Sequence, residues 1–235
     1  KHNREQFIIP IIDVSLSNQF LDSESFFSGI GIAILISLSN SGNFHKRLFA
    51  IDNTPTWIIF DKTDIFSMVS TFFDSIKSNK STYANFISAI DLIKNTIIES
   101  SVDKSFIEKI KIVILSDFDN IDSYFYNSLV HAFIRNDYDS YYPSFECSNI
   151  VYDDYFIPHF IFWNLSKKQN IPLPCSYDQH NTTLLSGFSP YLITHLFLDN
   201  KNIHNPYDFL TACLSNTHRY EFIDEYIAKI IPSNS

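Results

Sequence analysis

Apolar and polar residues along the chain form two kinds of segment that follow one another in turn. Short apolar runs of strand length occupy residues 6–14, 45–52 and 112–115. Between them, residues 64–78 and 83–100 place their apolar side chains three or four positions apart, which is the spacing of one helix face. Strands that are apolar throughout and alternate with helices predict a mostly parallel sheet with helices on both faces.

The same pattern predicts the remaining elements. Strands are expected over residues 55–61, 155–165 and 182–189, and helices over residues 25–40, 121–137, 190–200, 205–216 and 219–231. The helix over residues 25–40 is apolar on all sides, which is typical of a buried helix. We expect one domain over residues 1–235, with an insertion or long loop at 137–154, where the periodicity is lost, and extra C-terminal helices at 206–232.

Composition and charge narrow the range of partners. The chain has 235 residues, of which 45% are hydrophobic, and this is enough for a sizeable core. Its formal net charge of −9 disfavours broad binding to phosphate backbones and to anionic membranes. The many Ile, Asn, Ser and Lys residues are typical of an AT-rich coding sequence, so we give single Asn, Phe or Lys residues little weight as signals.

Compartment signals predict an intracellular, cytoplasmic protein. Three cysteines, Cys147, Cys175 and Cys213, form no CxxC pair, and a sparse, odd number of cysteines is typical of a reducing compartment. The first residues do not resemble a signal peptide, and the longest apolar stretch is too short and too interrupted to span a bilayer. We therefore expect no association with a membrane.

Two apolar strands end in aspartate, Asp13 and Asp117, and Ser15 and Ser17 follow the first of them at alternate positions. In a doubly wound sheet, ligands bind beyond the carboxyl ends of the strands. If the two strands are neighbours, these side chains gather hard oxygen donors, and a divalent cation would relieve the repulsion between the carboxylates. Such donors favour Mg²⁺ or Mn²⁺. The alternative is a turn in which the aspartate and serines cap the next element.

Enzyme chemistries fit the sequence less well, and we expect a protein that is not an enzyme. The segment SGFSP is similar to a hydrolase nucleophile elbow, but Tyr191 stands where the second glycine is required. An aspartyl-phosphate enzyme would use Asp13 as its nucleophile, but Ser15 stands where a second carboxylate is expected. The eight histidines show no HExxH or comparable zinc-binding pairing.

The segment DVSLS at residues 13–17 resembles the metal-ion-dependent adhesion site (MIDAS) of von Willebrand factor A domains, which has the form D-x-S-x-S. Further segments occur in the same order as in the C-terminal A-type domain of an uncharacterised family related to the Ro (TROVE) RNA-binding proteins. These segments are IDNTPTW, ANFISAIDLI, ILSDFD, PHFIFWNL and LLSGFSP. The resemblance extends from Phe7 to Leu198.

This resemblance implies a three-layer α/β sandwich of von Willebrand factor A type, with a Rossmann-like, mainly parallel six-stranded sheet and one antiparallel edge strand. It implies Mg²⁺ or Mn²⁺ at the top of the sheet. Ser15 and Ser17 would be direct ligands, and Asp13 and Asp117 would act mostly through water. A loop threonine completes such sites, and Thr82 is the candidate in this chain.

Two positions depart from the family pattern. Leu16 stands between the two serines, where a small residue is common. Alignment on Asn85 and Phe86 puts Ala84 at the place of the loop threonine, and Thr82 substitutes only if the loop is shifted. Without a hydroxyl at this place the metal loses a ligand, and the site is then weak or vestigial.

The function that we expect from the sequence is a non-enzymatic binding module. Its cation keeps an open position that favours an Asp or Glu side chain of a protein partner. The runner-up is an RNA-binding ribonucleoprotein component, by analogy with the Ro relatives, although much of their RNA contact comes from a helical-repeat ring. A third possibility is a scaffold with a degenerate metal site.

Overall fold

The structure of the chain is a computed structural model, and it describes residues 7–15, 24–52, 54–76, 84–99, 107, 109–119, 121–122, 124–134, 157–166, 172–176, 178–188, 192–193 and 196. The chain divides into two compact units, Lys1–Phe188 and Ser189–Ser235, and all elements below belong to the first. The insertion expected at 137–154 and the helices expected at 206–232 lie outside the described residues. The single-domain organisation stays a prediction.

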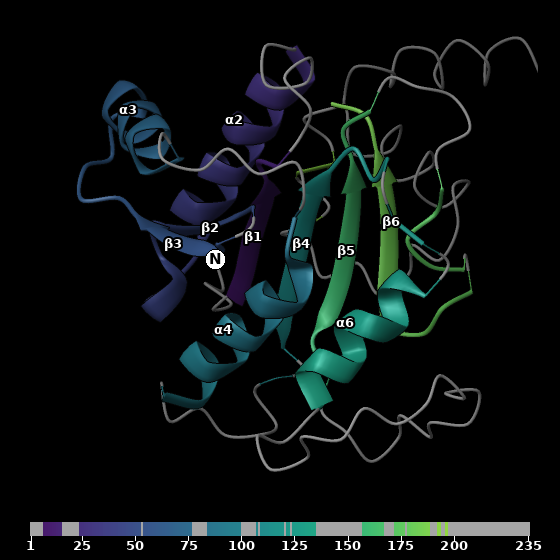
Figure 1. Ribbon diagram of the computed structural model, residues 1–235. Coiled ribbons are helices and arrows are strands. Elements are labelled where there is room, and N and C mark those ends of the chain that lie inside the picture. Colours follow the sequence, from purple (N-terminus) through teal and green to yellow (C-terminus); the bar gives the residue numbers. More distant parts are fainter. Residues whose placement is uncertain are drawn as a thin grey trace, which may run out of the picture. The chain divides into compact units, whose positions relative to one another are not determined.

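Six strands form one sheet in the order β3-β2-β1-β4-β5-β6 (Figure 1). Their bounds are β1 (Phe7–Asp13), β2 (Arg47–Ile51), β3 (Thr56–Ile59), β4 (Ile110–Ser116), β5 (His159–Asn164) and β6 (Thr182–Ser186). All neighbouring strands run parallel except β2 and β3, so β3 is an antiparallel edge strand. The expectation of an α/β fold with a mostly parallel six-stranded sheet is confirmed.

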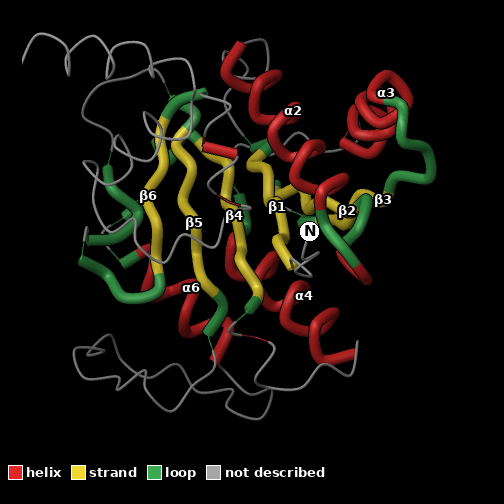
Figure 2. The backbone as a smooth tube through the Cα atoms, turned by 180° about the vertical axis from the view of Figure 1, so that it is seen from behind, coloured by secondary structure: helices red, strands yellow, loops and turns green. Residues whose placement is uncertain are grey.

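Helices cover both faces of this sheet. The described helices are α2 (Glu24–Ser39), α3 (Ile65–Ile76), α4 (Phe86–Glu99) and α6 (Phe125–Ile134), with a short 3₁₀ helix η1 (Gly42–Phe44). Figures 1 and 2 view the sheet from opposite sides and show α4 and α6 on one face and α2 on the other. The result is a helix–sheet–helix sandwich. Among the described residues, no helix is both long and apolar enough to cross a membrane.

The face beneath α4 and α6 carries one continuous apolar core. Ile11, Ile114 and Phe162 belong to it and come from the three central strands. Helix α4 adds Ile90 and Ile93, which lie three positions apart as its sequence pattern predicts. Because side chains alternate along a strand, this core also fixes which polar residues at the strand ends point toward the same face.

On the opposite face, α2 lies close to the sheet at one point and is open to solvent on its outer side. A Cβ atom at Gly29 would come within 2.6 Å of Leu165 Cδ1, so the glycine allows the close approach. The all-round apolar pattern of α2 predicts a buried helix, but Phe27 is 51% exposed and Leu35 is 48% exposed. Nine of the 16 residues of α2 are buried, so the expectation holds for most of the helix and fails at Phe27 and Leu35, which face outward.

At the start of β1, the side chain of Asn40 makes the backbone hydrogen bonds that a neighbouring strand would otherwise make. Pairing between β1 and β2 covers only the last three residues of β1, from Ile11 onward. Further back, the amide of Asn40 accepts a hydrogen bond from Ile8 N through Oδ1 at 2.8 Å and donates through Nδ2 to Ile8 O. Asn40 is 6% exposed, so it replaces missing backbone partners in a buried place.

His159 at the start of β5 is within hydrogen-bonding distance of one residue just before β6 and one residue within β6. Its Nδ1 is 3.1 Å from Asn181 Oδ1, and its Nε2 is 2.8 Å from Thr183 Oγ1. Burial lowers the pKa of His159 below its ordinary value, and the charge of Lys111 lowers it further, while the bond to Asn181 opposes both. The imidazole is therefore held in its neutral form.

We expect His159 to make the protein less stable in mild acid. Because its folded-state pKa lies below the unfolded value, its contribution is fully present above about pH 6.5 and is lost as the pH falls through the lowered pKa. Chemical denaturation at pH 7 and pH 5.5 should show a loss on the order of 1 kcal/mol that His159→Gln lacks. His45→Gln, at an exposed histidine that does not contribute to this shift, should keep the loss; if it removes the loss instead, His159 is not its source.

Candidate functional site

Polar side chains form a row across the carboxyl edge of the sheet. Ser116 at the end of β4 pairs with Asn164 of β5, which in turn pairs with Ser186 of β6. On the other side, Ser116 Oγ donates a hydrogen bond to Asp13 Oδ2 of β1 at 2.8 Å. Each member is the last residue of its strand, and partners across a parallel ladder share a face. The row Asp13–Ser116–Asn164–Ser186 therefore lies on one face of four adjacent strands.

That face is the one covered by α4 and α6. The residues two positions earlier in β1, β4 and β5 are Ile11, Ile114 and Phe162, and all three belong to the core beneath these helices. Side chains two apart in a strand point the same way. The polar row is thus the upper border of the main core, and a ligand bound there would contact both polar and apolar groups.

The Asp13 carboxylate is the one charged group of the row. It is 4% exposed. Its Oδ1 accepts hydrogen bonds from Ser15 N at 3.0 Å and Ser15 Oγ at 2.7 Å, while Oδ2 accepts the bond from Ser116. Burial raises the pKa of Asp13, the bonds to Ser15 and Ser116 oppose this, and the Asp52 carboxylate adds to the increase. Ionisation of Asp13 therefore costs free energy in this place, and a bound cation would offset that cost.

Two further carboxylates directly follow neighbouring strands. Asp52 comes after β2 and is 2% exposed, and its Oδ1 accepts a hydrogen bond from Thr54 N at 2.7 Å. Asp117 comes after β4 and is 7% exposed, and its Oδ1 accepts from Asp119 N at 3.2 Å. Strands β2, β1 and β4 are adjacent, so three buried carboxylates lie at three neighbouring strand ends.

The structure brings some of the residues expected at the site together. Asp13 and Ser15 are hydrogen-bonded to each other, and Asp117 follows the strand that pairs with β1. The condition that the strands bearing Asp13 and Asp117 are neighbours is therefore met. Ser17 and Thr82 lie outside the described residues, so their expected roles stay predictions.

The loop before α4 is fastened to the end of β2. Asn85 N donates to Asp52 O at 2.8 Å, and Asn85 Oδ1 accepts from Ser88 N at 3.0 Å and so caps α4. Ala84, next to this anchor, is partly buried and packs against the core. Its side chain offers no oxygen, so the place that the alignment gives to the loop threonine is apolar here.

Sequence reasoning missed two members of the site, Ser116 and Asp52. Ser116 was passed over in favour of the charged residue after it, although it is Ser116 that bonds to Asp13. Asp52 had the same signal as the two aspartates that were chosen, because it follows the apolar strand LFAI. An aspartate directly after each of three neighbouring strands is a stronger pattern than one after each of two.

Phe118 has an unusual backbone conformation beside the site. Its φ is 53°, in the left-handed region that bulky residues rarely adopt, and such strain costs on the order of 1–3 kcal/mol. Phe118 N donates to Ser116 Oγ at 3.1 Å, so the turn is fastened to the same hydroxyl that bonds to Asp13. The ring is 2% exposed and belongs to the core.

The chemistry of the donor set fits a hard divalent cation. Ser15 Oγ uses its proton on Asp13 and keeps its lone pairs, and the carboxylates supply negative charge. Oxygen donors of this kind suit Mg²⁺ or Mn²⁺ with water in the remaining positions. Within the described ranges, no three His, Cys, Asp or Glu side chains gather as a metal-binding group, and the candidate site combines carboxylates with serine hydroxyls.

The fold and this edge define an α/β protein with a polar edge at the carboxyl ends of its parallel strands. Comparison with known families then places the chain: it belongs to the family described as Domain of unknown function (DUF7788), which it matches over residues 8–225. The match includes β2 to β6 and all of β1 except Phe7. No curated protein matches the chain. The functional argument therefore depends on the geometry of the site.

Proposed function

We propose that the chain is a non-enzymatic binding module of von Willebrand factor A type, which uses Mg²⁺ or Mn²⁺ to engage an Asp or Glu side chain of a protein partner. The observation that carries this proposal is the Asp13 carboxylate, buried at a strand end and bonded to both Ser15 and Ser116. A buried carboxylate that the Asp52 carboxylate also repels is stabilised most directly by a cation.

The residues have distinct roles in this proposal. Ser15, with Ser17, coordinates the cation directly, and Asp13 and Asp117 hold its water ligands. Thr82 completes the set if its loop is shifted. Hydroxyls carry no charge, so the cation is not fully neutralised by its direct ligands. An anionic oxygen from a partner then completes the shell, which is why a carboxylate is the expected ligand.

The sheet supports the von Willebrand factor A assignment. Its central strands are parallel, its one antiparallel strand is at the edge, and the candidate site lies where β1 and β4 end side by side. These are the features that the resemblance of DVSLS and the following segments implies. We place the module in the cytoplasm, since free thiols such as that of Cys175 are typical of a reducing compartment.

Ala84 gives specific support to one competing function, a scaffold whose metal site is degenerate. Its methyl group packs against the core where a hydroxyl would be needed. If Thr82 does not reach the site, the cation has fewer ligands and binds weakly. Metal affinity therefore separates the binding module from the scaffold.

The deciding experiment measures Mn²⁺ binding first and partner chemistry second. Calorimetry with Mn²⁺ alone should show one site that EDTA reverses, and saturation at one hundred times Kd should stabilise the fold by about 2.7 kcal/mol. Acidic peptides should then bind only with Mn²⁺ present, with little dependence on salt. If wild-type protein binds no Mn²⁺ at millimolar concentration, the binding-module proposal is wrong.

RNA serves as the contrasting ligand. Phosphate binding weakens steeply as salt rises, because each contact releases counterions. At a net charge of −9 we expect no RNA affinity tighter than about micromolar at physiological salt, comparable to non-specific binding. Fluorescence anisotropy with single-stranded and structured RNAs at two salt concentrations measures this. Tight, salt-sensitive binding that survives EDTA would favour the ribonucleoprotein function.

A further inference from the structure

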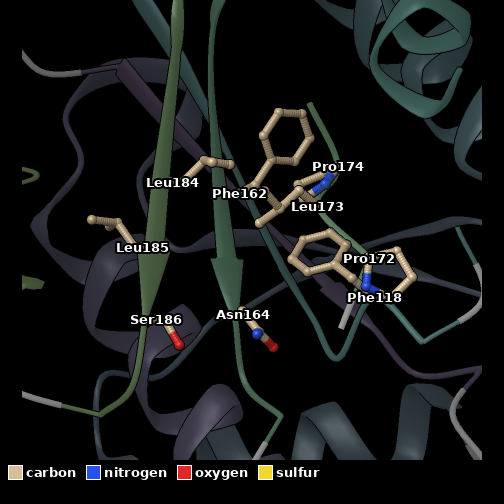
Figure 3. Close-up of a pocket in the computed structure, with 9 residues that line it drawn as sticks. All are labelled: Phe118, Phe162, Asn164, Pro172, Leu173, Pro174, Leu184, Leu185 and Ser186. Atoms are coloured by element: carbon tan, nitrogen blue, oxygen red, sulfur yellow. The ribbon is translucent and has the colours of Figure 1, made fainter. Parts of the chain in front are cut away.

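A cavity of about 200 Å³ lies at the far end of the polar row, between the ends of β5 and β6 and the segment 172–174 (Figure 3). Its apolar walls are Phe118, Phe162, Pro172, Leu173, Pro174 and Leu184. Asn164 and Ser186, the last two members of the row, also line it. The cavity is thus apolar inside and polar along the border that it shares with the candidate cation site.

Several contacts keep the cavity preformed. Trp163 Nε1 donates to Gly187 O at 2.8 Å, and Gly187 N donates to Asn164 O at 3.3 Å, so the ends of β5 and β6 are tied together. Two prolines in the opposite wall, Pro172 and Pro174, have fixed φ angles. A site that needs little rearrangement loses less entropy on binding than a flexible one.

The strained turn at Phe118 connects the cavity to Asp13. Its backbone N–H bonds to Ser116 Oγ, and the same hydroxyl bonds to Asp13. Phe118, whose phenyl ring forms one wall of the cavity, is therefore bonded through its backbone to Ser116, the residue that contacts Asp13. A non-glycine residue at positive φ persists only where its surroundings hold it, and such residues cluster at functional sites.

We propose that this cavity is a specificity pocket for one aliphatic side chain of the partner, carried three or four residues away from the acidic residue that meets the cation. This inference rests on the proposed function, because the acidic residue is the second anchor. It goes further in naming the partner as an extended peptide segment with one acidic and one apolar side chain at a set distance.

The distance between Asp13 and the cavity determines how many residues separate the acidic and the apolar side chain of the partner. Neighbouring strands lie about 4.8 Å apart, so the cavity at β5 and β6, two to three strands from β1, is about 10–14 Å from β1 along the row. An extended peptide rises about 3.3 Å per residue and covers that span in three or four residues. A segment that crosses the strand ends along the polar row can therefore place its carboxylate near Asp13 and an apolar side chain in the cavity.

The volume of the cavity and the residues that line it determine which side chain of the partner it can hold. A cavity of about 150 Å³ with apolar walls accommodates benzene. The present volume therefore takes one Leu, Ile or Met side chain. Asn164 Oδ1 accepts from Ser166 N at 2.8 Å, which leaves its Nδ2 to donate to a carbonyl of the peptide backbone. An apolar anchor with a polar border is the usual composition of a specific binding pocket.

A displayed library of short peptides tests the inference. Each peptide carries one glutamate at its centre, all other positions are random, and bound peptides are selected with Mn²⁺ and eluted with EDTA. We expect enrichment of Leu, Ile or Met three or four positions from the glutamate, on one side of it only. Replacing that residue by alanine in a selected peptide should weaken binding about tenfold or more.

Two matched variants locate the preference. Leu173→Asp puts a charge into the cavity wall, and Leu92→Asp puts one on α4 at a leucine of similar exposure, 43% against 45%. We expect Leu173→Asp to remove the advantage of the apolar residue without changing Mn²⁺ affinity, and Leu92→Asp to keep it. Both leucines are partly exposed, so neither change should prevent folding.

The outcomes separate this inference from the proposed function. If glutamate peptides are selected with Mn²⁺ but show no apolar preference, or if Leu92→Asp removes it equally, the pocket is wrong and the metal-dependent function stands. If apolar peptides bind equally well in EDTA, the cavity is not coupled to the cation and the inference is also wrong. If neither Mn²⁺ nor any peptide binds, the proposed function and the pocket fail together.

Discussion

Replacement of Asp13 by asparagine is expected to weaken Mn²⁺ binding by about 10–100-fold and to raise the melting temperature of the metal-free protein. Mn²⁺ affinity falls while the melting temperature rises, because the buried carboxylate stabilises the bound cation but destabilises the metal-free fold. Asparagine has the same shape, and its Oδ1 can still accept the bonds that Ser15 N and Ser15 Oγ donate to Asp13. Only the charge and one acceptor are lost.

The direction of the stability change follows from the pKa. Burial, with a smaller contribution from Asp52, raises the folded-state pKa of Asp13 above its unfolded value. The folded protein therefore binds the proton more tightly, and its free energy of unfolding falls as the pH rises from the unfolded value through the raised one. Asparagine does not titrate, so the variant does not lose this part of the free energy of unfolding at neutral pH. Each kcal/mol gained should raise Tm by about 2–4 °C in a domain of this size.

Asp64→Asn is the matched control. The exposed Asp64 carboxylate caps α3 by accepting a bond from Ser67 N at 2.8 Å, and its bonds to Ser67 lower its pKa. The control should leave Mn²⁺ affinity unchanged and slightly lower Tm at neutral pH. If Asp13→Asn and the wild type bind Mn²⁺ equally, the cation does not use this carboxylate. If neither binds and Tm still rises, a turn at the strand end explains the residue.

The main elements of the fold could be predicted because burial imposes a period on the sequence. Helix α4 buries Ile90, Ile93 and Ile97, and this spacing is visible in the chain alone. The strands β1 and β4 are buried on both faces and therefore read as continuous apolar runs. In α2, which is mostly buried, the apolar pattern does not show that Phe27 and Leu35 stay exposed, because it gives no information about which neighbours cover a helix.

Details of the site depend on register, which the sequence does not encode locally. A shift of one residue between β1 and β4 would place Asp117 beside Asp13 in place of Ser116. Both arrangements are compatible with an apolar strand that ends in serine and aspartate. The choice is made by backbone pairing over the whole strand and by packing on both faces, so the hydroxyl partner of Asp13 emerged only from the structure.

The cavity was also beyond sequence analysis, for a related reason. Its walls come from the ends of three strands and from the segment 172–174, which has no periodic pattern. The sequence alone gives Asn164 no definite place, since a polar residue after FIFW fits a cleft and a turn equally well. The pairing of Asn164 with Ser116 and Ser186 gives it a definite place in the polar row.

Asn40 shows the cost of discounting a common residue. In a chain rich in asparagine, a single one carries little weight, yet this side chain completes β1. Its Oδ1 accepts from Ile8 N at 2.8 Å, and its Nδ2 donates to Ile8 O and, at 3.4 Å, to Phe44 O. Ile8 is 1% exposed, so water has poor access to these backbone groups. The amide, which has both a donor and an acceptor, is suited to this place.

Asn40→Ala is therefore expected to destabilise the protein by about 2–4 kcal/mol, because it leaves a buried N–H and C=O of Ile8 unpaired. Thermal unfolding should show a Tm lower by about 5–15 °C. Asn40→Asp should also destabilise, since a carboxylate cannot donate to Ile8 O and adds a buried charge. Asn95→Ala, at an exposed position of α4, is the control and should change stability by less than about 0.5 kcal/mol. Equal stabilities of the Asn40 and Asn95 variants would mean that pairing with β4 alone holds the start of β1.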